Sequence, residues 1–253
     1  NVPELLEKGN KVDRVHHKCK LEPRDANLAD WRAMVERVKD GEKTVKVGIV
    51  GKYFASGDFS LSDSYISVIE AIKHAAAANH CRVQLTWLSA EELETKGVEH
   101  LKAFDGLIIP QGWGSRGSEG KIKAIEYCRV NKVPYFGLCY GMQMAVIEYA
   151  RHVLGLSDAH SAEAEPSTYN PVIHIMPEQA ELLAKKQYGG TIRLGAWPCE
   201  LKAGTHLAKA YANKFAEQTV ISERHRHRYE FNNAYRKQLE EAGLVVSGTS
   251  PDD

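Results

Sequence analysis

The chain has 253 residues, of which 33 are basic and 33 acidic, so its formal net charge is zero. This balance argues against a nucleic-acid-binding protein, because such proteins usually carry a basic surface. Apolar residues make up 43% of the chain, which is enough for a full core, yet no stretch approaches the roughly 20 apolar residues that span a bilayer. We therefore expect a soluble protein without nucleic-acid or membrane partners.

The cysteines indicate a reducing compartment. They are odd in number and widely scattered, without the close pairs of a zinc site or a disulfide framework. They are Cys19, Cys81, Cys128, Cys139 and Cys199. A cytoplasmic protein without a bound metal fits this pattern best.

The N-terminal part differs in texture from the rest. Residues 1–26 are mostly charged and include a basic cluster at 16–20, which we interpret as a solvated linker. Asn27 is a candidate N-cap for a helix with one apolar face. That face is formed by Trp31, Met34, Val35 and Val38. We expect this helix to dock on a neighbouring surface.

From residue 45 onward, strands and helices alternate. The strands are expected at 45–50, 83–87, 107–109 and 133–138. The first helix is expected at 62–78, with Ile66, Ile69 and Ile72 facing inward, and a short second helix is expected after a capping box formed by Ser89 and Glu92. Two further helices are expected around 122–128 and at 142–154, and the last of them ends at Gly155. Because such crossovers are nearly always right-handed, we predict an α/β fold with a doubly wound, mostly parallel sheet flanked by helices.

The chain after Gly155 is less regular. Short apolar segments at 172–175, 192–194 and 220–221 predict strands around the binding edge, and 244–246 is strand-like. Helices are predicted at 207–217 and 233–242.

A nucleophile elbow is predicted at Cys139. This cysteine lies between Gly137 and Gly141 where an apolar strand turns into a helix, and small residues at these positions let strand and helix pack closely. The positive end of the helix dipole is expected to favour the thiolate. The alternative is a small buried hydrophobic residue, the commonest role of a free cysteine.

A second glycine cluster supports the nucleophile. Residues 112–117 follow the strand at 107–109, so both turns are expected at the carboxyl edge of a parallel sheet, where such folds bind ligands. There the N–H groups of Gly112 and Tyr140 are positioned to form an oxyanion hole. Gly120 and Lys121 resemble the end of a phosphate loop, but Ser115 replaces its first glycine, so no Walker A loop is present.

The charged run 223–230, Glu-Arg-His-Arg-His-Arg-Tyr-Glu, is expected to form a strand. Alternation then places Arg224, Arg226 and Arg228 on one face, and His225 and His227 on the other. The spacing suggests no third metal ligand for the histidines, so the residues alone indicate a solvated or salt-bridged strand.

Together the elbow, the run 223–230 and the segment 189–195 resemble the glutamine amidotransferase domain of the CTP synthase family. The resemblance implies a class I glutamine amidotransferase (flavodoxin-like) fold over 45–253, C-terminally incomplete. It also implies that residues 1–44 are a linker and docking helix from a missing N-terminal synthetase domain. In the family this domain hydrolyses L-glutamine through a cysteine thioester, and the ammonia serves the ATP-dependent amination of UTP to CTP.

The resemblance also implies residue roles and partners. Cys139 would be the nucleophile, and Gly112 and Tyr140 would form the oxyanion hole. The residues that would bind glutamine are Gly112, Tyr140, Gly141, Met142, Gln143, Glu163 and Arg228. No cofactor is implied in this domain; ATP and magnesium belong to the synthetase domain, with UTP as substrate and GTP as effector. The full-length protein is expected to be a cytoplasmic homotetramer.

Departures from the family pattern leave two other functions open. Gln111, Trp113 and Tyr140 replace the usual glycine, phenylalanine and leucine, and the His-Pro-Glu segment that supplies the catalytic base is absent. A catalytically silent regulatory or binding module on the same fold is one alternative. Another elbow-cysteine hydrolase, such as a peptidase or γ-glutamyl hydrolase, is the other.

Overall fold

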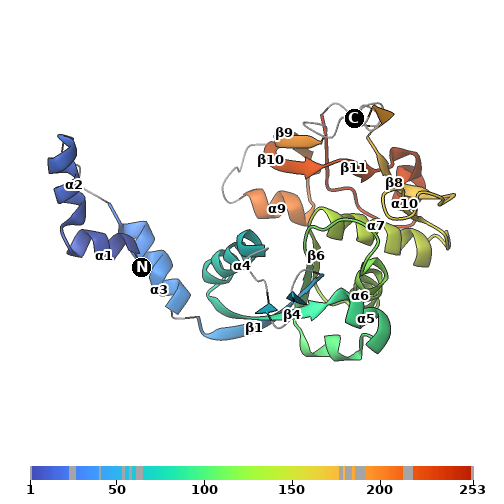
Figure 1. Cartoon of the computed structure of the whole chain (residues 1–253), viewed down its shortest axis with the longest axis horizontal. Coiled ribbons are helices and arrows are strands. Elements are labelled where there is room, and N and C mark those ends of the chain that lie inside the picture. Colours follow the sequence, from blue (N-terminus) through green and yellow to red (C-terminus); the bar gives the residue numbers. More distant parts are fainter. Residues whose placement is uncertain are drawn as a thin grey trace. The chain divides into compact units, whose positions relative to one another are not determined.

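The computed structural model describes residues 2–22, 27–39, 41–52, 55–56, 59–60, 65–176, 179, 184–185, 192–212 and 219–251. The chain divides into two compact units (Figure 1). The first comprises 1–47 and 62–85, and the second comprises 48–61 and 86–253.

The first unit is largely helical. It contains α1 (Val2–Lys8), α2 (Lys11–Cys19), α3 (Ala29–Lys39) and α4 (Ile66–Ala78). The predicted N-cap is confirmed, since Asn27 Oδ1 accepts a hydrogen bond from the Ala29 N–H at 3.1 Å. Helix α3 packs on α4, although Trp31 remains 39% exposed and Val38 50% exposed. The predicted apolar face of this helix is therefore only partly covered.

Two predictions for this unit need comment. The segment 1–26, interpreted as a solvated linker, contains the helices α1 and α2, which have no buried residue. Arg32 on α3 pairs with Glu7 at 3.0 Å and with Glu4 at 3.5 Å, which fastens α1 to α3. In α4, Ile69 is buried as predicted, but Ile66 is 51% exposed because Val68 takes an inward position instead.

The main sheet has the strand order β4-β1-β5-β6. Its strands are β1 (Lys43–Gly51), β4 (Cys81–Ser89), β5 (Gly106–Ile109) and β6 (Tyr135–Gly137). Strands β5 and β6 are parallel, with Leu107 opposite Tyr135 and Ile109 opposite Gly137. In chain order this is the 2-1-3-4 arrangement of flavodoxin-like doubly wound sheets. The predicted fold class is confirmed.

Helices α5 (Ala90–Lys96), α6 (Ser118–Asn131) and α7 (Tyr140–His152) build the core with this sheet, together with the short 3₁₀ helix Glu99–Ala103. The predicted cap is present, since Ser89 Oγ accepts from the Glu92 N–H at 3.4 Å. Helix α6 approaches α5 so closely that a Cβ on Gly120 would collide with the Ala90 carbonyl. Leu107, Ile109, Met144 and Ile147 are among the fully buried side chains of this core.

Two smaller sheets follow the core helices. Strand β9 (Arg193–Leu201) pairs antiparallel with β10 (Val220–His227) and with β12 (Gly248–Thr249). Strand β8 (Pro171–Ile175) lies between β7 (His160–Ser161) and β11 (Tyr229–Phe231). A hairpin of β2 (Ala55–Ser56) and β3 (Phe59–Ser60) belongs to the same unit.

Several predictions for the chain after Gly155 differ from the structure. The strands expected at 192–194 and 220–221 are much longer, because β9 and β10 pair along eight residues. Residues 244–246 are not a strand; the pairing occurs at Gly248 and Thr249 instead. Helix α9 (His206–Ala212) matches the start of the helix predicted at 207–217, and 213–218 lie outside the described residues. The last predicted helix divides into a 3₁₀ turn, Asn233–Tyr235, and α10 (Arg236–Glu241).

Within the part of the chain that the structure describes, no helix has the length and apolar character needed to cross a membrane.

Candidate active site

Cys139 occupies a strained elbow between β6 and α7. Its backbone angles, φ 52° and ψ −106°, lie in a region that L-residues rarely adopt. The turn is closed by a hydrogen bond from the Gly141 N–H to the Leu138 carbonyl at 2.9 Å. A Cβ on Gly141 would collide with the Ile109 carbonyl, and one on Gly137 would lie 2.6 Å from the Gly141 carbonyl carbon. Both glycines are therefore required by close packing, and the predicted elbow is confirmed.

The thiol of Cys139 is half-buried and has a raised pKa. Burial is the main cause, and the negative charge of Glu163 adds to it, whereas a hydrogen bond from the Tyr140 N–H lowers the pKa. The sulfur also contacts the Arg226 carbonyl at 3.9 Å. We expected the helix terminus to favour the thiolate, and this expectation is wrong. The N–H contact lowers the pKa of the thiol, but desolvation raises it by more.

Hydrogen bonds from neighbouring side chains hold the glycine loop 112–117 in place. The Tyr140 hydroxyl donates to the Gly114 carbonyl at 2.5 Å, and Lys52 donates from Nζ to the Trp113 carbonyl. Gly114 and Gly117 have φ values of 66° and 72°, which favour glycine. A Cβ on Gly112 would lie 3.5 Å from the Tyr140 ring. The Tyr140 side chain thus lies beside Gly112, while the convergence of their two N–H groups into an oxyanion hole stays a prediction.

Glu163 joins this loop from a distant part of the sequence. The Gly114 N–H donates to Glu163 Oε1 at 3.3 Å, and the Glu163 N–H donates to Ser161 Oγ at 3.2 Å. Burial raises the pKa of the Glu163 carboxyl, and the opposing effects come first from the Gly114 N–H and then from the charges of Lys52 and Arg228. A carboxylate and a guanidinium therefore share one region beside the glycine loop.

The charged run forms the end of β10, a bend at Arg228 and the start of β11, so the single strand predicted over 223–230 is interrupted. His225 and His227 share a face, with Nδ1 of the former 2.8 Å from Nε2 of the latter. Burial lowers the pKa of His227 to about 4, with the charge of His225 as a further cause. Among the described residues, no group of three or more side chains is arranged to hold a metal ion.

Gln143 links the elbow helix to this strand bend. Its Nε2 donates to the Tyr229 carbonyl at 3.0 Å, and its side chain is buried. Within the described part of the chain its Oε1 has no hydrogen-bond partner, although it is inaccessible to solvent. Gln143 thus has an acceptor available beside the elbow.

A cavity of about 660 Å³ opens next to the nucleophile. Among the residues that line it are Cys139, Met142 and Gln143 from the elbow, and Arg226 and Tyr229 from the strand bend. Gly112, Tyr140, Gly141, Glu163 and Arg228 are not part of this lining. Of the predicted site residues, the cavity therefore brings together only Cys139, Met142 and Gln143.

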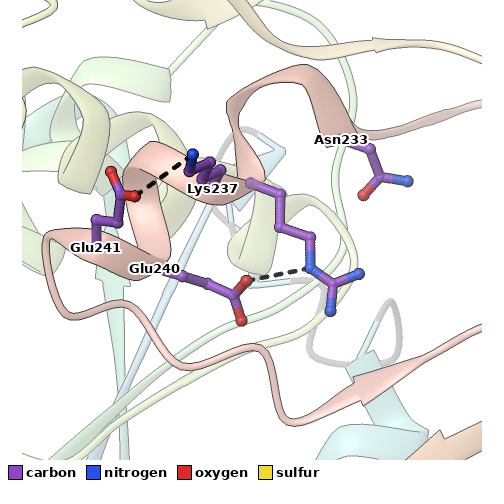
Figure 2. A pocket seen from close by; sticks show the side chains of 5 residues that line it. Asn233, Lys237, Glu240 and Glu241 are labelled. Atoms are coloured by element: carbon purple, nitrogen blue, oxygen red, sulfur yellow. Dashed lines mark hydrogen bonds and ion pairs between the residues drawn. The ribbon is translucent and has the colours of Figure 1, made fainter.

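A second cavity, of about 520 Å³, has a different character (Figure 2). It is lined by Asn233 on the 3₁₀ turn and by Arg236, Lys237, Glu240 and Glu241 on α10. Arg236 pairs with Glu240 at 3.3 Å and Lys237 with Glu241 at 3.9 Å, both one helical turn apart. Ion pairs of this kind near the surface contribute little to stability, and Asn233 and Arg236 also line the cavity beside Cys139.

Two lysines near the glycine loop escaped the sequence interpretation. Lys52 and Lys121 place Nζ 5.8 Å and 4.7 Å from the centre of the Tyr140 ring. Lys121 is completely buried, which, together with the charge of Lys52, lowers its pKa to about 7. The only sequence signal was the Gly-Lys pair, which we considered solely as part of a phosphate loop.

Comparisons with known proteins agree with this geometry. The model of the family "Glutamine amidotransferase class-I" matches residues 60–253. The CTP synthase of Listeria innocua serovar 6a is 48% identical over 253 residues, which is 100% of this chain and 45% of that protein. The CTP synthase of Pyrococcus furiosus is 47% identical over 252 residues, with 100% and 44% covered. The chain thus spans less than half the length of these relatives.

A solved structure supports the same assignment. It is described as the glutaminase domain of Trypanosoma brucei CTPS with bound acivicin, and it matches with a TM-score of 0.70 and 36% sequence identity. The match covers 81% of this chain and 75% of the other. A cysteine elbow, a facing glycine loop and a family match over most of its length together show that the chain belongs to the class-I glutamine amidotransferase family.

Proposed function

We propose that the chain is the glutaminase domain of a CTP synthase. In this proposal it hydrolyses L-glutamine through a thioester on Cys139, and the ammonia serves the amination of UTP to CTP. The observation that carries the proposal is the position of Cys139, on a strained elbow that lines a cavity and whose thiol is influenced by the charge of Glu163. The relatives and the solved structure support the same activity.

The chemistry follows from the groups around the sulfur. The Cys139 thiolate attacks the side-chain amide carbon of glutamine, and the oxyanion is received by the N–H groups of Gly112 and Tyr140. The Tyr140 N–H already contacts the sulfur, so it lies next to the reacting atom. The carbon–nitrogen bond then breaks as the nitrogen takes up the proton that the Cys139 thiol lost on ionising, so ammonia leaves and the thioester remains. Water attacks the thioester carbonyl, the carbon–sulfur bond breaks, and one water proton returns to the sulfur as glutamate is released.

The amino-acid end of glutamine requires one anion and one cation. Glu163 complements the α-ammonium group, and Arg228 complements the α-carboxylate through its planar guanidinium. The influence of Arg228 on the pKa of Glu163 is consistent with their sharing one site. Gln143 Oε1 supplies a further acceptor, while Gly141 and Met142 shape the elbow around it. Each assignment is a proposal for mutagenesis.

The remaining partners belong to the whole protein. We propose an N-terminal synthetase domain that binds UTP and ATP with magnesium and responds to GTP. We also propose a cytoplasmic homotetramer. The relatives support this view, since they are CTP synthases of which this chain spans less than half.

Alkylation of Cys139 tests the proposal at the nucleophile. This step requires the thiolate and the substrate grip but no proton for departing ammonia, which matters because the sequence contains no His-Pro-Glu run. Acivicin, the ligand named for the Trypanosoma brucei structure, should label Cys139 and no other cysteine by peptide mass spectrometry, and excess L-glutamine should protect it. Cys139→Ser should abolish the label.

The same experiment separates the alternatives. A silent binding module with a blocked pocket would leave Cys139 unlabelled and would give no heat with glutamine in isothermal titration. A peptidase or γ-glutamyl hydrolase would cleave peptide or folate conjugates without acting on glutamine. Either result would overturn the proposed function.

A further inference from the structure

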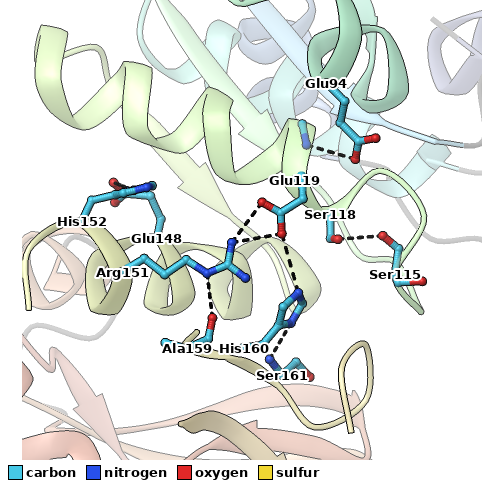
Figure 3. Close-up of polar contacts among 11 residues, drawn as sticks. Glu94, Ser115, Ser118, Glu119, Glu148, Arg151, His152, Ala159, His160 and Ser161 are labelled. Carbon is cyan, nitrogen blue, oxygen red and sulfur yellow. Dashed lines mark hydrogen bonds and ion pairs between the residues drawn. The ribbon is translucent and has the colours of Figure 1, made fainter. Parts of the chain in front are cut away.

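A charged cluster holds together the two loops that form the glutamine-binding region. Glu119 lies in the first turn of α6, directly after the glycine loop, and Arg151 lies in the last turn of α7. His160 lies on β7, three residues before Glu163. We refer to Glu119, Arg151 and His160 as the clamp; Figure 3 shows their side chains pointing toward one another.

Arg151 makes the strongest contacts in the clamp. Its Nη1 donates to both carboxylate oxygens of Glu119 at 3.0 Å, and its Nε donates to the Ala159 carbonyl at 2.7 Å. Bonds from a guanidinium to a carboxylate are stronger than neutral hydrogen bonds. One side chain therefore ties the start of α6 to the main chain just before β7.

His160 completes the connection with a defined tautomer. The Ser161 N–H donates to His160 Nδ1 at 2.8 Å, so this nitrogen carries no proton. The proton of the neutral ring is then on Nε2, which faces Glu119 Oε1 at 3.7 Å. His160 and Arg151 together lower the pKa of Glu119 to about 2, with the histidine contact as the larger cause. The Glu119 carboxylate is therefore ionised at neutral pH.

The clamp continues into the turn that carries Glu163. Ser161 is fully buried, and its Oγ accepts from the Glu163 N–H at 3.2 Å. On the other side, the Ser118 hydroxyl donates to the Ser115 carbonyl at 2.6 Å, which fixes the glycine loop to α6. The two branches meet where the Gly114 N–H donates to Glu163 Oε1.

We propose that Glu119, Arg151 and His160 are positioning residues, which set the separation between the glycine loop and the Glu163 carboxylate and so determine how the α-amino end of glutamine is held. This inference rests on the proposed function. A clamp of this kind acts on recognition of the amino-acid end of the substrate and leaves the intrinsic reactivity of the thiol unchanged.

Two alkylating reagents distinguish positioning from general stability. Acivicin requires the amino-acid grip, whereas iodoacetamide has no α-amino group and reports only on access to the thiol and its ionisation. In Glu119→Gln we expect the rate of acivicin labelling at Cys139 to fall about tenfold, since small misplacements of positioned groups have effects of this order. The iodoacetamide rate at Cys139 should stay within about twofold of the wild type.

A second ion pair between the same helices, more deeply buried than the first, provides the control. Arg129 on α6 contacts Glu148 on α7 at 2.7 Å, and Glu148 is 1% exposed; within the described part of the chain this pair makes no contact with the Glu163 turn. Glu148→Gln should lower the melting temperature while leaving the ratio of the acivicin and iodoacetamide rates unchanged. An effect on that ratio equal to that of Glu119→Gln would overturn the inference.

The histidine gives an independent comparison, which also serves if Glu119→Gln does not fold. His160→Asn keeps one donor and one acceptor and should retain most of the acivicin rate, whereas His160→Ala should lose it. Equal acivicin rates in wild type, Glu119→Gln and His160→Ala would overturn the inference alone. A wild-type chain that iodoacetamide labels at Cys139 but acivicin does not would overturn the proposed function, and the inference with it.

Discussion

Replacing the buried Lys121 with methionine should stabilise the protein in a strongly pH-dependent way. Lys121 is completely inaccessible to solvent, and its Nζ has no hydrogen-bond partner among the described residues. Burial, assisted by Lys52, lowers its pKa from 10.5 to about 7. The Tyr140 ring, 4.7 Å away, offsets part of this cost, but a cation–π contact contributes only about 0.5–2 kcal/mol.

The sign of the effect follows from proton linkage. Below pH 7 the lysine is protonated in both folded and unfolded chains, so the folded state bears the full cost of a buried charge. Between pH 7 and 10.5 the folded state holds a neutral amine while the unfolded state is protonated, so wild-type stability rises with pH. Each pH unit in this window is worth about 1.36 kcal/mol.

The magnitude can be measured by thermal unfolding. Lys121→Met should have a larger free energy of unfolding than the wild type. Between pH 6 and pH 9 this difference should shrink by roughly 2–3 kcal/mol, because about two pH units of that interval lie above the folded-state pKa of Lys121. For a chain of this size the difference in melting temperature should then change by about 5–10 °C. Groups common to both proteins cancel in this comparison.

An exposed lysine on the same helix supplies the control. Lys123→Met should show no comparable change with pH, since Lys123 is exposed. A constant difference in melting temperature between Lys121→Met and the wild type at both pH values would refute the reasoning. It would mean that Lys121 reaches solvent or a partner that keeps it charged.

Three further results are expected around the elbow. Cys139→Gly should raise the free energy of unfolding by about 1 kcal/mol relative to Cys139→Ala in urea titrations, because glycine relieves the positive φ; equal stability of the two variants would argue against strain. Gly141→Ala should lower it by about 3 kcal/mol or more through collision with the Ile109 carbonyl, and a loss below about 1 kcal/mol would show that the elbow can relax. Glu163→Gln should lower the pKa of Cys139, so iodoacetamide should label Cys139 faster at pH 8, as measured by mass spectrometry, while acivicin should label it more slowly. Labelling rates that change in the same direction with both reagents would contradict the assignment of Glu163.

Local sequence patterns were sufficient where one short segment specifies its own geometry. The alternation of strands and helices from residue 45 and the glycines on either side of Cys139 were predicted and confirmed, whereas the strand predicted over 223–230 ends at His227. Each confirmed feature depends on periodicity or on a steric requirement that lies within a few residues. The exposed helices at the N-terminus were missed, because they bury no residue and their charged composition was interpreted as a linker.

The sequence by itself therefore predicted the fold class and the elbow, which the structure confirms, and it singled out Cys139 as the candidate nucleophile. Only the tertiary structure decided the environment of the sulfur, where burial raises the pKa of Cys139 against the expected effect of the helix terminus. It also decided that Lys121 lies beneath the glycine loop and that Glu119, Arg151 and His160 meet. Desolvation and contacts between distant segments depend on how many chain atoms surround a group, and no local pattern encodes that number.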